Sequence, residues 1–158
     1  GTVACRRRGL GLATTAADRD ENKGSAEFAL DMSVPGMRSL SDIVSMHGHM
    51  TPDTRHLISK ASVATMRSGW MLINTSRGGL VDARACIEAL KSGRLGYLGL
   101  DVYEEESDLF FEDLSGQILQ DDLLARLLTF PNVIITAHQA FFTRTALDNI
   151  AETTMENL

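Results

Sequence analysis

One short stretch, residues 70–82 (WMLINTSRGGLVD), limits the fold of this chain more than any other. It opens with four apolar residues, 70–73, a run short enough for a buried strand of a parallel sheet. Small polar residues follow at 74–76, and then come Arg77 and two glycines. Ligands of an open α/β sheet bind outside the carboxyl ends of its strands. An arginine at such an end, beside glycines that let the backbone approach closely, suits a fork that binds a carboxylate. The alternative is an ordinary surface arginine in a strand-to-helix turn.

Composition excludes several classes of protein. A chain of 158 residues, 44% hydrophobic and 23% charged, is typical of a single globular domain. The net charge of -6 argues against a nucleic-acid partner, because binding phosphates requires a basic face. No apolar run approaches the roughly 20 residues of a membrane span. The two cysteines, Cys5 and Cys86, lack metal-type spacing, so we expect a reducing compartment and a cytoplasmic protein.

The beginning of the chain has features of its own. Three arginines at 6–8 precede GLGLATTAA, which could be mistaken for the start of a secretory signal. The apolar part is short and rich in glycine and threonine, and no Met precedes it, so the sequence disfavours a signal peptide. A chain that begins at Gly1 without Met is expected to be a fragment or a processed product.

Strand and helix patterns alternate along the chain. Strands are expected at 12–17, 42–46, 70–73, 95–100 and 132–136. Helices are expected at 59–66, from a cap at Asp82 to Ser92, at 120–129 and from a cap at Thr143 onward. This alternation predicts an α/β fold with a doubly wound parallel sheet of the Rossmann type. Residues 19–38 give little signal. In the last helix, apolar residues recur at helical spacing, and we expect this stripe in the core. Its members are Leu147, Ile150, Ala151, Met155 and Leu158.

Four chemically capable residues stand at the ends of predicted strands: Asp18, Arg77, Asp101 and His138. Because the carboxyl ends of parallel strands meet at one edge of a sheet, they are predicted to converge on a single crevice. An acid at the end of a second strand suits the adenosine ribose of a dinucleotide. Taken alone, Asp18 is more often a solvated loop acid, because charged residues are mostly exposed.

These residue types match one task, the transfer of a hydride between a 2-hydroxy acid and nicotinamide. His138 can take the hydroxyl proton as the hydride leaves. A carboxylate beside it, Glu106, would orient the imidazole and favour its charged form. Arg77 would bind the substrate carboxylate, and it would polarise the keto oxygen when the reaction runs in the direction of reduction. Asp101 would face the nicotinamide side of the cofactor.

Three motifs resemble the signature regions of the D-isomer-specific 2-hydroxyacid dehydrogenases: NTSRGGLVD, GLDVYEEESDLFFED and NVIITAHQAFFT. The resemblance is dense from Ser41 onward and thin before it, and the segment LFFEDLSGQILQDDLLARLL favours the lactate branch. It implies NAD as cofactor, a small D-2-hydroxy or 2-keto acid as substrate, and Arg77, Glu106 and His138 as catalytic residues.

The resemblance also implies a set of cofactor-binding residues: Asp18, His47, Gly48, Thr75, Ser76, Arg77, Asp101 and His138. Two positions differ from the proline that is common in the family, His49 and Arg19. The difference at His49 affects the expected wall of the cofactor site, and the difference at Arg19 affects the expected preference for NAD over NADP.

The resemblance has consequences for domain organisation. Residues 1–158 would form one partial NAD-binding domain, incomplete at its N-terminus and without the substrate domain. The glycine fingerprint and the first strand of the nucleotide fold would be missing, which leaves a sheet edge unpaired. We therefore expect this polypeptide alone to be a poor or inactive enzyme. The family usually forms homodimers through this domain, so a homodimer is expected.

Other interpretations stay open. His47 and His49 point the same way on an extended chain, but no third ligand has convincing spacing, so no metal site is predicted. Ser76, Asp101 and His138 follow the chain order of α/β-hydrolases, yet the G-x-S-x-G elbow is absent. A non-catalytic NAD-binding module, like the NAD-sensing corepressors related to this family, would keep the same three residues. A truncated, inactive copy is the remaining alternative.

Overall fold

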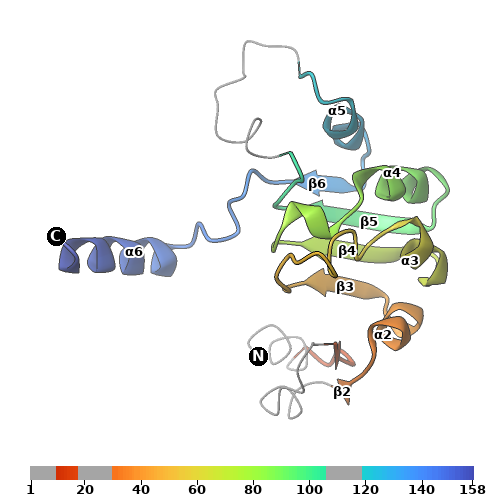
Figure 1. The fold of residues 1–158 in the computed structure, drawn as a ribbon, viewed down its shortest axis with the longest axis horizontal. Helices are drawn as coiled ribbons and strands as arrows, with labels where there is room; N and C mark the ends of the chain where they lie inside the picture. Colours follow the sequence, from red (N-terminus) through yellow and green to blue (C-terminus); the bar gives the residue numbers. More distant parts are fainter. Residues whose placement is uncertain (1–9, 18–29, 106–118) are drawn as a thin grey trace.

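The computed structural model describes residues 10–17, 30–105 and 119–158 (Figure 1). The strands are β1 (Thr15–Ala16), β2 (Leu30–Asp31), β3 (Ile43–Met46), β4 (Trp70–Asn74), β5 (Leu95–Leu100) and β6 (Val133–Ile135). The helices are α2 (Val34–Leu40), α3 (Lys60–Thr65), the 3₁₀ turn η1 (Gly78–Leu80), α4 (Ala83–Lys91), α5 (Asp122–Leu128) and α6 (Arg144–Glu156).

Among the described residues all strand pairs are parallel, and the strands form two sheets. The larger sheet has the order β3-β4-β5-β6, and β1 pairs with β2 in a separate sheet of two strands. Strands connected by helices and paired in parallel confirm the predicted α/β fold of the Rossmann type. In that fold one more strand lies between the two groups. Within the described residues, β3 pairs only with β4.

The core lies on one face of the larger sheet. Alternate strand residues such as Val44, Leu72 and Leu98 are buried there against α3, α4 and α5. Side-chain caps set where these helices begin, because Ser59, Asp82 and Asp121 accept hydrogen bonds from the first-turn amides. The predicted strands at 42–46, 70–73, 95–100 and 132–136 match the observed ones within one residue.

Two elements begin within residues 19–38, a stretch that carries little signal for secondary structure. They are β2 and α2. A signal for α2 was present, because Ser33 caps the helix and Pro35 occupies its first turn. The predicted strand at 12–17 is shorter than expected, since only Thr15 and Ala16 pair.

The last helix corrects a prediction. Helix α6 begins at its expected cap, Thr143, but it has no buried residue. Leu147 is 39% exposed, Ile150 52% and Met155 72%, so the apolar stripe is not part of the core. Figure 1 shows the reason: α6 extends away from the sheet and its covering helices. The stripe is helical in period, but no element of the described chain packs against it.

Candidate functional site

A buried asparagine shapes the turn that carries Arg77. Asn74, the last residue of β4, is fully buried. Its Nδ2 donates to the carbonyl of Arg77 at 2.9 Å, and its Oδ1 accepts from the amide of Ser76 at 3.1 Å. The turn is therefore closed by the side chain at its base, as asparagine does in Asx turns. Arg77 itself is exposed, and its Nη1 donates to the carbonyl of Ser76 at 2.8 Å.

Asp101 follows β5 and is only 4% exposed. Its Oδ1 accepts from the Thr136 hydroxyl and, at 2.8 Å, from the amide of Gln139. Its Oδ2 accepts from the amide of Ala140 at 2.8 Å. Both oxygens are thus engaged by the segment that follows β6. The carboxylate holds that segment against the end of β5.

Opposing effects act on the Asp101 carboxyl. Burial raises its pKa, because the charged form loses hydration. Hydrogen bonds from Thr136, Ala140 and Gln139, together with the nearby His138, favour the carboxylate and prevail. The pKa of Asp101 therefore lies below its ordinary value, and the group is ionised at neutral pH.

His138 has an unusual backbone conformation. Its φ is +52°, in the left-handed region that residues other than glycine rarely adopt. Its amide donates to the carbonyl of Asp101 at 2.7 Å and to that of Thr136 at 3.0 Å. The residue is half-buried. Strained backbone of this kind persists where the surroundings hold it, often at functional sites.

The ends of β3 and β4 are joined through Ser76, whose hydroxyl donates to the carbonyl of Gly48. His47 Nε2 lies 2.8 Å from the hydroxyl of Ser45. His47, Gly48 and Thr75 are exposed, and a Cβ added to Gly48 would meet no atom within 4 Å. This open surface of small polar groups at strand ends fits a dinucleotide lying across the sheet edge.

The four residues predicted at strand ends, together with Glu106, divide into three groups. The structure brings Asp101 and His138 into direct contact. Arg77 stands at the neighbouring strand end, and its successor Gly78 packs on the backbone of Tyr103, where an added Cβ would lie 2.1 Å from the carbonyl carbon. Asp18 and Glu106 lie outside the described residues.

Sequence reasoning missed two supporting residues, Asn74 and Thr136. The first had a usable signal, an asparagine two residues before a serine at a strand end. The second had none, since its bond to Asp101 spans 35 residues. The described parts of the chain contain no group of three or more possible metal ligands, and none of their helices is long and apolar enough to cross a membrane.

Comparisons with known proteins agree with this geometry. Residues 1–140 match the family model described as "D-isomer specific 2-hydroxyacid dehydrogenase, NAD binding domain". The chain is 44% identical over 152 residues to the D-lactate dehydrogenase of Escherichia coli, covering 96% of this chain and 46% of that protein. It is 56% identical over 118 residues to 2-hydroxyacid dehydrogenase A of Aspergillus oryzae, covering 75% of this chain and 34% of that relative.

Solved structures show the same similarity. A D-lactate dehydrogenase from Sporolactobacillus sp. superposes with a TM-score of 0.94 at 33% identity, covering 99% of this chain and 47% of that one. The NAD-complexed 2-hydroxyacid dehydrogenase of Lactobacillus delbrueckii ssp. bulgaricus gives a TM-score of 0.91 at 30% identity, with 98% and 47% covered. The chain thus spans about half the length of these relatives.

Proposed function

We propose a function for this chain, which belongs to the D-isomer-specific 2-hydroxyacid dehydrogenase family. It would supply the NAD-binding part of an enzyme that interconverts a D-2-hydroxy acid and a 2-keto acid. The D-lactate and pyruvate pair is the proposed substrate type, because relatives named D-lactate dehydrogenase match 96% or more of this chain. The observation that carries the proposal is the bonding of Asp101 to the segment of His138 beside the Arg77 turn.

In the proposed reaction NAD, when bound, supplies the hydride acceptor. The residues proposed to line its site are Asp18, His47, Gly48, Thr75, Ser76, Arg77, Asp101 and His138. The exposed strand ends at Gly48 and Thr75 leave room for such a ligand. Since both Asp101 oxygens are engaged by the segment after β6, this carboxylate would act mainly by holding His138 in place.

The chain's own residues would handle the charge and the proton. The Arg77 guanidinium would bind the substrate carboxylate through two parallel N–H donors. An imidazole nitrogen of His138 would take the hydroxyl proton as the C–H bond breaks, and return it in the reverse direction. Glu106 would orient this imidazole.

Two variants test these roles in the protein at its native length, His138→Gln and Arg77→Gln. We expect the first to lower kcat for pyruvate reduction by about 100-fold or more, with NADH affinity changed little. The second should chiefly raise the KM for pyruvate. Retention of activity by His138→Gln would refute its role as acid and base. NADH binding without any turnover in the unaltered protein would favour the non-catalytic module.

The domain organisation is part of the proposal. Residues 1–158 would form a partial NAD-binding domain without the substrate domain, and this polypeptide alone would be poorly active. In the part of the chain that the structure describes, β3 pairs only with β4 and the apolar stripe of α6 is uncovered, and both observations support this view. The intact mass of the polypeptide isolated from its source tests it. A mass well above 17.2 kDa would agree, and one near 17.2 kDa would contradict it.

We also propose a homodimer in the cytoplasm. Tyr97 and Ile134 are exposed on the same face of neighbouring strands, because Tyr97 lies two residues before Gly99, the pairing partner of Ile134. Such apolar exposure suits association. Within the described residues Cys86 is a free thiol, as a reducing compartment allows. Light scattering coupled to gel filtration would report a monomer if the dimer is wrong.

A further inference from the structure

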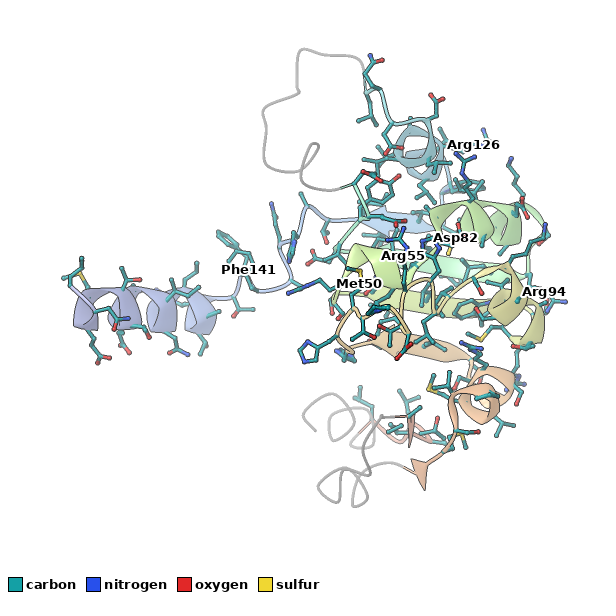
Figure 2. The ribbon with its side chains drawn as sticks, in the orientation of Figure 1. Met50, Arg55, Asp82, Arg94, Arg126 and Phe141 are labelled. Atoms are coloured by element: carbon teal, nitrogen blue, oxygen red, sulfur yellow. The ribbon has the colours of Figure 1, made fainter. Side chains whose placement is uncertain are left out.

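Glu104 forms an ionic cluster outside the proposed catalytic set. Its Oε1 accepts from Nη2 of Arg55, and its Oε2 lies 3.1 Å from Nε2 of His56. The two partners precede Glu104 by 49 and 48 residues, so the cluster joins the loop after β3 to the chain after β5. Figure 2 shows Arg55 and Met50 toward the carboxyl ends of the strands, and Arg94 at the opposite end.

The backbone of His56 connects this cluster to the loop after β4. Its φ is +49°, a left-handed conformation that costs free energy for a histidine. Its amide donates to the carbonyl of Gly79 at 2.8 Å, and the amide of Ile58 donates to the carbonyl of Leu80 at 3.0 Å. The strained residue thus presents its amide to the Arg77 loop and its imidazole to Glu104.

A direct backbone contact completes the connection. Gly78 packs so closely on the chain after β5 that an added Cβ would lie 2.1 Å from the carbonyl carbon of Tyr103 and 2.4 Å from the amide of Glu104. The loops after β3, β4 and β5 therefore contact one another in a closed ring. Residues 77–79 lie between the other two loops, and Glu104 provides the side-chain bond that joins those two.

We propose that Glu104 is a positioning residue for Arg77, acting through His56. An exposed ion pair contributes little, so the bond to Arg55, whose side chain is 56% exposed, is the weaker part. The bond to His56 matters more because it holds a strained residue whose amide binds Gly79. Without Glu104, His56 would relax toward an ordinary conformation and release the carbonyl of Gly79. The guanidinium of Arg77 would then be less well placed for a substrate carboxylate.

Amide hydrogen exchange on the 158-residue chain tests, without ligand or activity, whether Glu104 holds His56 and the Arg77 loop in place. We call this restraint the lock. The main variant is Glu104→Ala, with Glu104→Gln as a milder change and Glu105→Gln as the control for charge at an exposed neighbour. We expect exchange at the amides of His56 and Leu80 to rise about tenfold or more in Glu104→Ala, the size for losing a hydrogen bond to a charged group. Strand amides such as that of Leu72 should not change.

The outcomes separate the lock from a general loss of stability. Faster exchange confined to the Arg77 loop and His56, with Glu104→Gln intermediate and Glu105→Gln unchanged, supports the proposal. Unchanged exchange at His56 in both Glu104 variants overturns it. So does an equal rise at all amides, because that pattern means global destabilisation.

A second measurement concerns the consequence for substrate, and it rests on the proposed function of Arg77. In the protein at its native length, Glu104→Ala should raise the KM for pyruvate about tenfold and leave the KM for NADH within twofold. Equal KM values in variant and parent, despite faster exchange, would overturn the positioning role. An unaltered protein without turnover would count against the proposed function, and the exchange data would still decide whether the lock exists.

Discussion

The carboxylate of Asp101 accepts a hydrogen bond of 2.8 Å from the backbone amide of Ala140, two residues after His138. The same carboxylate accepts a hydrogen bond from the amide of Gln139, so it binds the two residues that directly follow the histidine. An ionised acid that accepts several N–H bonds is held firmly, because each bond is charge-assisted. The placement of His138 thus depends on the charge at the end of β5.

Replacing Asp101 with asparagine should destabilise the chain by about 2 kcal/mol at neutral pH, because an amide nitrogen would face a backbone donor. The effect should also depend on pH. The pKa of Asp101 is lowered in the folded chain, so its contribution is full above the unfolded value of about 3.9 and lost as the pH falls toward the folded value. The melting temperature, followed by the fluorescence of Trp70, should therefore fall less steeply between pH 7 and 3 in Asp101→Asn than in the parent.

Asp42→Asn is the matched control, because Asp42 is 77% exposed in its ion pair with Arg67. It should change the melting temperature little. Parallel pH profiles for Asp101→Asn and the parent would contradict the inferred charge of the buried group.

Two adjacent glycines should respond differently to a single methyl group. In Gly78→Ala the new Cβ would meet the backbone of Tyr103 at 2.1 Å, and backbone cannot move aside without shifting the strand end. We expect a loss of more than about 3 kcal/mol. In Gly79→Ala the nearest atom, at 2.4 Å, is Sδ of Met50, the far end of a flexible and exposed side chain. We expect a loss of less than about 1 kcal/mol there. Urea unfolding of both variants is the measurement, and equal losses would rule out the close backbone contact.

Helix α6 should be dispensable for the stability of the sheet. It buries none of its own residues, so a chain ending at Thr143 loses no core packing. The melting temperature of this shortened chain should lie within about 2 °C of that of the parent. A matched variant, Leu127→Ala in the fully buried part of α5, should instead lose about 2 to 5 kcal/mol. Cooperative loss of structure on removing α6 would show that the helix packs on the body in solution.

Much of the fold follows from local sequence patterns. The strands from β3 to β6 were predicted because each is a short apolar run bounded by turn residues, as in 95–100. The caps at Asp82 and Thr143 were predicted because one side chain and its following amides decide them. The stripe of α6 was misassigned, because helical periodicity shows that a face is apolar and does not show what covers it.

The site was predictable only in part. Placement at strand ends brought Arg77, Asp101 and His138 to one edge, since parallel topology determines which ends meet. The bonds that hold them are long-range and often involve the backbone, such as that from Ala140 to Asp101 across 39 residues. Hydrogen bonds made by backbone groups cannot be predicted from residue types, because every residue other than proline carries the same amide and carbonyl. The roles of Glu104 and His56 were hidden for the same reason.

Titration of the ¹⁵N-labelled 158-residue chain with NADH tests the central claim most directly. We predict saturable binding, with shift changes concentrated at 47–48, 75–77, 101 and 138, the carboxyl ends of β3 to β6. Helix α6 and the opposite ends of the strands, near Arg94, should show none. Absence of saturable shifts up to about 1 mM NADH, or shifts confined to α6, would contradict a nicotinamide site at these strand ends.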